Sequence, residues 1–226
     1  MPAGGFCMDR SYDTRLQATE YTNFFPYIGV DYNLSSPRIL VLGHSAYAAG
    51  TDDESVEKWD QYTERIRELI EDDYLNTLAD TGRTRRYVRC FRNMAAVLAG
   101  KGYGQSDSIW NSLAFHDFFQ KHVGNSPENR HWLTDELRVR SQKALFEVIS
   151  ILSPDIVIAW GKELWYRDLP QNDWEWIHED IKIYRYTEHP QTWFWGMMHP
   201  SARMFSIDTV RERWIEVLNF YTLHHS

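Results

Sequence analysis

Three short polar segments carry the side chains of this sequence that are best suited to acid–base chemistry. They are residues 43–47 (GHSAY), 115–117 (FHD) and 199–201 (HPS). Each follows a run of apolar residues typical of a buried strand. A histidine changes protonation near neutral pH, a serine can hold a water molecule, and a carboxylate accepts hydrogen bonds. If the fold brings these strand ends together, the three segments form a candidate site.

The apolar pattern predicts the elements that must position these segments. Short apolar runs predict strands at 38–43, 111–115, 155–160, 181–186 and 193–198. Helical spacing predicts helices over 54–79, over 84–99, between Thr134 and Ser153, and over 208–223. Strands separated by helices indicate a mostly parallel sheet covered on both faces. In such folds a site lies at the carboxyl ends of the strands.

Length and composition indicate one domain over residues 1–226. Hydrophobic residues make up 43% of the chain and charged residues 25%, and the 10 Trp, 13 Tyr and 11 Phe need burial or a ligand. No stretch reaches the ~18 apolar residues of a membrane span, and the first ten residues lack the apolar region of a signal peptide. We therefore expect a cytoplasmic protein with no membrane partner.

The cysteine content and the distribution of charge limit the cofactors and binding partners that we expect. Cys7 and Cys90 are the only cysteines, too few for a disulfide scaffold, an all-cysteine zinc site or a four-cysteine iron–sulfur cluster, and we expect no cofactor. The net charge is −8, but residues 81–101 contain five arginines, one lysine and no acid. Arg85 and Arg86 in this stretch belong either to a phosphate-binding stripe or to a solvated face paired with the acidic residues before it.

Four segments in order resemble motifs of the uracil-DNA glycosylase superfamily. They are the strand leading into GHSAY (39–47), AFHDFFQ (114–120), PDIVIAWG (154–161) and HPSARMF (199–205). The resemblance covers most of the chain and is greatest to bacterial members. It implies an α/β fold, a three-layer α/β/α sandwich with a central, mostly parallel four-stranded sheet. It also implies an enzyme that flips a base out of DNA and breaks the bond between base and sugar.

The resemblance implies catalytic roles for His199 and for the first loop. The histidine of the family's HPS motif donates a hydrogen bond to O2 of the leaving base; the alternative is that His199 only caps its strand. Where the family has an aspartate or asparagine that positions water, this chain has Ser45. Serine holds water but is a poor base, so His44 is the second candidate, with Asp52 or Asp53 behind it.

Other residues of these segments are predicted to contact the base. Gly43 and Tyr47 would lie against it, Tyr47 at the C5 edge or else in the core. Asp117 stands where uracil-specific members carry asparagine. A carboxylate accepts from the N4 amino group of cytosine and repels O4 of uracil, unless Asp117 merely caps a turn. Phe115 either stacks on the base or belongs to the core.

The residues after the HPS motif resemble the wedge that fills the gap left by a flipped base. The candidates for contact with DNA are Ser201, Arg203, Met204 and Phe205. Met204 or Phe205 would insert into the duplex, and Arg203 would contact a phosphate or the orphaned base. Ordinary loop packing is the alternative.

Together these features predict a monomeric, monofunctional DNA glycosylase that excises a modified pyrimidine and leaves an abasic site. The resemblance extends to bacterial enzymes that remove glucosylated 5-hydroxymethylcytosine from phage DNA, so a modified cytosine and a defence role are the first hypothesis. No lysine stands in the predicted site, so no Schiff-base step is expected. The alternatives are a uracil-type repair enzyme, a non-catalytic protein that binds modified DNA, and an enzyme acting on free nucleotides.

Overall fold

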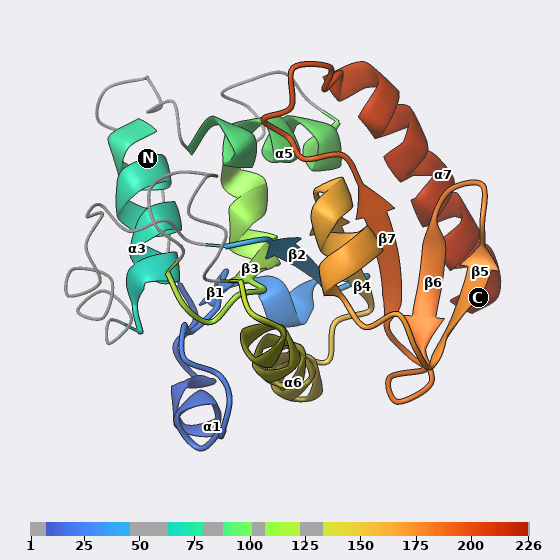
Figure 1. The fold of residues 1–226 in the computed structure, drawn as a ribbon. Coiled ribbons are helices and arrows are strands. Elements are labelled where there is room, and N and C mark those ends of the chain that lie inside the picture. The colour runs from blue at the N-terminus through green and yellow to red at the C-terminus, as the bar shows by residue number, and fades with distance from the viewer. Residues whose placement is uncertain (1–7, 46–62, 79–87, 101–106, 123–132, 226) are drawn as a thin grey trace.

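The computed structural model describes residues 8–45, 63–78, 88–100, 107–122 and 133–225. One mixed sheet of seven strands, in the order β1-β3-β2-β4-β7-β6-β5, forms its centre (Figure 1). The strands are β1 (Tyr27–Ile28), β2 (Ile39–Gly43), β3 (Leu113–Asp117), β4 (Ile156–Trp160), β5 (Trp174–His178), β6 (Ile183–Tyr186) and β7 (Trp193–Met197).

Four neighbouring strands, β3, β2, β4 and β7, form a parallel core. At one side β1 pairs antiparallel with β3, and at the other β6 and β5 continue the sheet as antiparallel strands. The predicted number of four strands is therefore wrong. The missed β1 has only two residues, and β5 is partly exposed, so neither shows the continuous apolar run of a buried strand.

The strand carrying the FHD segment starts later than predicted. Residues 107–112 form a 3-10 helix, η4 (Asp107–Ser112), so β3 covers 113–117 rather than 111–115. The whole FHD segment therefore lies inside the strand. Since side chains alternate between the two faces of a strand, Phe115 and Asp117 share one face and His116 points to the other.

Helices connect the strands and cover both faces of the sheet. They are α1 (Asp13–Gln17), η1 (Tyr32–Leu34), α3 (Arg65–Ile70) with its π-helical continuation η2 (Glu71–Asn76), α5 (Arg89–Ala99), α6 (Asp135–Leu152), the π-helical η6 (Leu164–Asp168) and α7 (Ile207–His225). α6 begins as predicted, because Oγ of Thr134 accepts a hydrogen bond from the backbone N–H of Leu137. It ends at Ser153, which has a left-handed backbone conformation.

Two apolar clusters bury the two faces. On one face Val41, Phe115 and Ile158 pack with α3, α5 and α7. On the other face Leu40 and Val157 pack with α1, α6 and η6. The alternation of side chains along each strand explains the division. No helix in the described ranges combines the length and the apolar character that crossing a membrane requires.

Candidate active site

The three polar segments meet at the carboxyl ends of the parallel strands. Gly43, at the end of β2, pairs with Asp117, at the end of β3, and Trp160, at the end of β4, pairs with Met197, at the end of β7. His199 follows β7, and its ring centroid lies 5.6 Å from that of Trp160. The structure thus places the described parts of the three segments, residues 43–45, 115–117 and 199–201, at one edge of the sheet.

Gly43 is the point of closest approach between these strand ends. A Cβ atom at this position would lie 2.3 Å from Oδ1 of Asp117, 2.7 Å from Cζ of Phe115 and 3.1 Å from Nε1 of Trp160. Real Cβ atoms essentially never come as close as the first two distances, so any larger residue would displace the Asp117 carboxyl group or the Phe115 ring. The glycine therefore lets Asp117 and Trp160 lie side by side.

Asp117 is buried, with 4% of its surface exposed. Burial raises the pKa of Asp117 to about 7, and the charge of Arg65 offsets only part of this rise. Near neutral pH the carboxyl group is therefore present in both forms. The protonated form can donate one hydrogen bond, whereas the ionised form only accepts. The sequence-based prediction for Asp117 holds for the ionised form alone.

His199 is held in a single neutral form. Its Nδ1 accepts a hydrogen bond from the backbone N–H of Ser201 at 3.1 Å and lies 2.7 Å from Oγ of the same serine. Burial, with a smaller contribution from His44, lowers the pKa of His199 to about 4. Because Nδ1 is an acceptor, the proton of the neutral ring must sit on Nε2. His199 therefore offers an uncharged N–H donor.

The sequence matches no known family model and no curated protein.

His44 makes the shortest side-chain contact in the described part of the first loop, residues 43–45, and its partner was not predicted. Nε2 of His44 lies 2.8 Å from Oδ2 of Asp168, the last residue of η6, and Nδ1 lies 3.3 Å from Oγ of Ser45. The Asp168 side chain is fully buried. Asp168 stands in the segment WYRDLP, which has no motif character, so sequence inspection had no reason to choose it. Only the fold brings it to His44.

In the loop after β7, the two residues predicted to insert into the duplex, Met204 and Phe205, differ in exposure. Pro200 is anchored to α5, because Nδ2 of Asn93 donates to its carbonyl oxygen at 2.7 Å. Met204 is 84% exposed, whereas Phe205 packs against the core. Arg203 and Ser201 are exposed. Met204 is therefore the residue of this loop that is free to insert into a partner.

The aromatic residues of the second segment are buried. Phe115 is 2% exposed, and its ring packs 4.9 Å from that of Phe91 and 5.2 Å from that of Trp160. It therefore forms the floor beneath Gly43 and has almost no free face for stacking. Phe119 is also buried and supports His44 edge-on at a centroid distance of 5.1 Å.

His116 has a structural role on the opposite face of β3. Its Nε2 lies 3.1 Å from Nε2 of Gln120, whose Oε1 accepts from the backbone N–H groups of Asn23 and Phe24. Burial lowers the pKa of His116 to about 3, so the ring is neutral. The histidine of the FHD segment thus belongs to the network that fixes the lead-in to β1.

Three predicted contact residues, Tyr47, Arg85 and Arg86, lie outside the described residues. The same holds for Asp52 and Asp53. Within the described ranges, no three His, Cys, Asp or Glu side chains are grouped as they would be around a metal ion.

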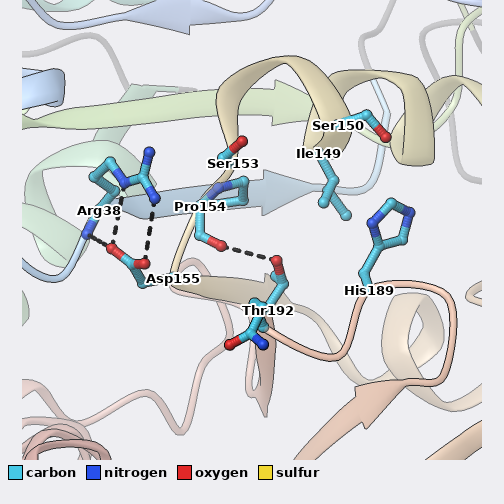
Figure 2. A pocket seen from close by; sticks show the side chains of 9 residues that line it. Arg38, Ile149, Ser150, Ser153, Pro154, Asp155, His189 and Thr192 are labelled. Atoms are coloured by element: carbon cyan, nitrogen blue, oxygen red, sulfur yellow. Dashed lines mark hydrogen bonds and ion pairs between the residues drawn. The ribbon is translucent and has the colours of Figure 1, made fainter. Parts of the chain in front are cut away.

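A separate pocket lies at the opposite edge of the sheet, where β2 and β4 begin (Figure 2). Two pairs of its polar groups bond to each other. Arg38 donates from its backbone N–H at 2.7 Å and from its guanidinium at 3.4 Å to Asp155, and Oγ1 of Thr192 donates to the carbonyl of Pro154 at 2.8 Å. None of the residues predicted to be functional lines this pocket.

Proposed function

We propose that this protein is a monofunctional DNA glycosylase that excises a flipped, modified pyrimidine and leaves an abasic site. One observation carries the proposal: a neutral histidine, His199, presents an N–H donor at the sheet edge where the buried carboxyl of Asp117 and the His44 ring also lie. Cleavage of a base–sugar bond needs such a donor, because negative charge develops on the leaving base.

In the proposed reaction a water molecule attacks C1′ of the flipped nucleotide. The bond between C1′ and the base nitrogen breaks, and its electron pair leaves with the base. Nε2–H of His199 donates to O2 of the resulting anion, while His44 takes the proton of the attacking water. The products are an abasic deoxyribose and a base anion that is later protonated. No residue of the chain becomes covalently attached to the DNA.

Recognition of the base is assigned to Asp117, beside Gly43 and Trp160. In its ionised form the carboxyl group accepts from the N4 amino group of a cytosine-type base. Its pKa of about 7 also favours a second candidate, because the protonated form can donate to O4 of a uracil-type base. The first candidate is therefore a modified cytosine and the second a uracil derivative.

Contact with DNA is assigned to the exposed loop after β7. Met204 would fill the gap left by the flipped base, and Arg203 and Ser201 would contact the backbone, with Arg85 and Arg86 as further phosphate contacts. We also propose that the chain has the three-layer α/β/α sandwich that the resemblance to the glycosylase superfamily implies.

A panel of DNA substrates tests the proposal. The purified protein is incubated with single- and double-stranded oligonucleotides that contain uracil, thymine, 5-hydroxymethyluracil, 5-hydroxymethylcytosine or a glucosylated form of it, and then treated with alkali. We expect strand breaks for one class of base, and only after alkali. Binding without abasic sites would identify a non-catalytic protein instead. Faster cleavage of free nucleotides than of DNA would identify a nucleotide hydrolase.

A further inference from the structure

Among the described residues at this edge of the sheet, Asp168 has the most completely paired carboxyl group. Its Oδ2 lies 2.8 Å from Nε2 of His44 and 3.0 Å from a terminal nitrogen of Arg167. Its Oδ1 lies 3.0 Å from Nε of Arg138 and 2.9 Å from Nε of Arg167. A carboxylate has about four acceptor positions, so these four contacts use all of them. The group is held from three elements, the β2 loop, α6 and η6.

The ionisation of Asp168 determines which nitrogen of His44 carries the proton. Burial would raise the pKa of the carboxyl, but the hydrogen bonds from His44, Arg167 and Arg138 hold that pKa well below its usual range. An ionised carboxylate only accepts, so Nε2 of His44 must donate. The neutral ring then has its lone pair on Nδ1, which lies 3.3 Å from Oγ of Ser45.

We propose that Asp168 is a positioning residue that fixes His44 as the base, with Nδ1 directed at a water molecule held by Ser45. This inference rests on the proposed glycosylase function and names the group that replaces the missing aspartate of the first loop. When the water attacks C1′, its proton moves to Nδ1 and its oxygen forms the new C1′–O bond. The imidazolium formed in this step lies against the Asp168 carboxylate, which stabilises its charge.

A purely structural role would also explain a buried aspartate between two arginines. The two roles differ in how a substitution acts. If the role is structural, a substitution of Asp168 slows excision because it destabilises η6 and α6. If Asp168 positions His44, the substitution slows excision only while His44 is present. Substitutions of Asp168 and His44, made singly and together, separate these possibilities.

The test measures the single-turnover excision rate and the DNA dissociation constant for Asp168→Asn, His44→Ala and the double variant. Asparagine keeps the shape of the side chain but loses the charge that selects the His44 tautomer. We expect Asp168→Asn to slow excision by about 100-fold or more with little change in DNA affinity. In the His44→Ala background the same substitution should change the rate by less than about threefold. A full loss of rate in that background would overturn the proposal.

Asp155→Asn is the matched control. Asp155 also pairs with an arginine, Arg38, but at the opposite edge of the sheet (Figure 2). It should leave the excision rate unchanged. If Asp155→Asn slows excision as much as Asp168→Asn does, the effect is one of general stability, and the positioning role is wrong.

A measurement without DNA keeps this proposal separate from the glycosylase proposal. Nitrogen-15 NMR of the histidine side chains at alkaline pH reports which ring nitrogen of His44 carries the proton. We expect Nε2–H in the wild-type protein and a mixture of tautomers in Asp168→Asn. Nδ1–H in the wild-type protein would overturn the positioning role even if excision is observed. The expected tautomer with no excision of any base would leave the positioning geometry standing and refute the glycosylase function.

Discussion

Oδ1 of Asp117 lies only 2.3 Å from the place that a Cβ atom of residue 43 would occupy. A side chain at position 43, the end of β2, would occupy the space that the Asp117 carboxyl group fills at the end of β3, and a glycine leaves this space free. The two residues are neighbours in the register of the sheet but 74 positions apart in the sequence (117 minus 43).

Gly43→Ala is expected to disturb the candidate site and the core together. The added methyl group must displace Asp117 or Phe115, at a cost of about 1–3 kcal/mol in the free energy of unfolding, and excision should fall at least tenfold. Thermal unfolding and the excision assay measure the two effects. Gly100→Ala is the control, because a Cβ added at Gly100 would meet open space. The only strain there comes from the left-handed backbone, which alanine disfavours. If the Gly43→Ala variant excises the base at the wild-type rate, the close packing around Gly43 is not needed for excision.

His199→Ala should lower the excision rate by about 100-fold, the usual effect of losing one donor to a developing anion. His199 is half-buried and its Nδ1 bonds to Ser201 of the same loop, so the melting temperature should change little. Since the pKa of His199 is about 4, the wild-type rate should not fall through protonation of this residue between pH 5 and pH 8, roughly a unit or more above that value. A near-wild-type rate for His199→Ala would show that the histidine is not the donor.

Asp117 should make the choice of base depend on pH. Below its pKa of about 7 the protonated carboxyl favours a uracil-type base, and above it the carboxylate favours a cytosine-type base. The ratio of cytosine-type to uracil-type excision should therefore rise as the pH increases through 7. Asp117→Asn should shift the ratio toward uracil by roughly 5- to 150-fold and remove its dependence on pH. An unchanged ratio in the variant would place Asp117 outside the recognition site.

The same carboxyl group predicts a pH-dependent difference in stability. An aspartate whose pKa is raised by folding stabilises the fold below about pH 4, and this contribution is lost as the pH rises to about 7. Asp117→Asn does not ionise, so it should be more stable than the wild-type protein by up to a few kcal/mol at pH 8. Near pH 4 the difference should be much smaller. Urea unfolding at the two pH values tests this, and a constant difference would contradict the raised pKa.

Met204→Ser should weaken excision from duplex DNA more than from single strands. An exposed apolar side chain can replace a flipped base in the stack, and a single strand has no stack to restore. We expect a loss of about tenfold on duplex and little change on single-stranded DNA. Leu223→Ser is the control, because Leu223 is 78% exposed near the end of α7. Equal losses on both substrates would argue against a wedge.

The sequence alone predicted the four parallel strands of the core, with β3 placed two residues early, and the four longest helical stretches of the described residues. Runs such as ILVLG and IVIAW are short, have no polar residue and are rich in β-branched residues, so they indicate strands buried on both faces. Thr134 predicts the start of α6 because capping depends on neighbouring residues only. The three polar segments were also evident, since the carboxyl ends of parallel strands must lie at one edge. Their chemical roles stay predictions.

Only the tertiary structure decided the number of strands, the position of β3 and the partner of His44. Short or half-exposed edge strands leave no apolar run, and whether residues 107–112 form a 3-10 helix depends on packing around them. Asp168 is paired with His44 across 124 residues. The ionisation of Asp117 and the tautomers of His44 and His199 depend on burial and on contacts between distant segments. No local pattern of residues encodes these properties, because they arise when the chain closes around them.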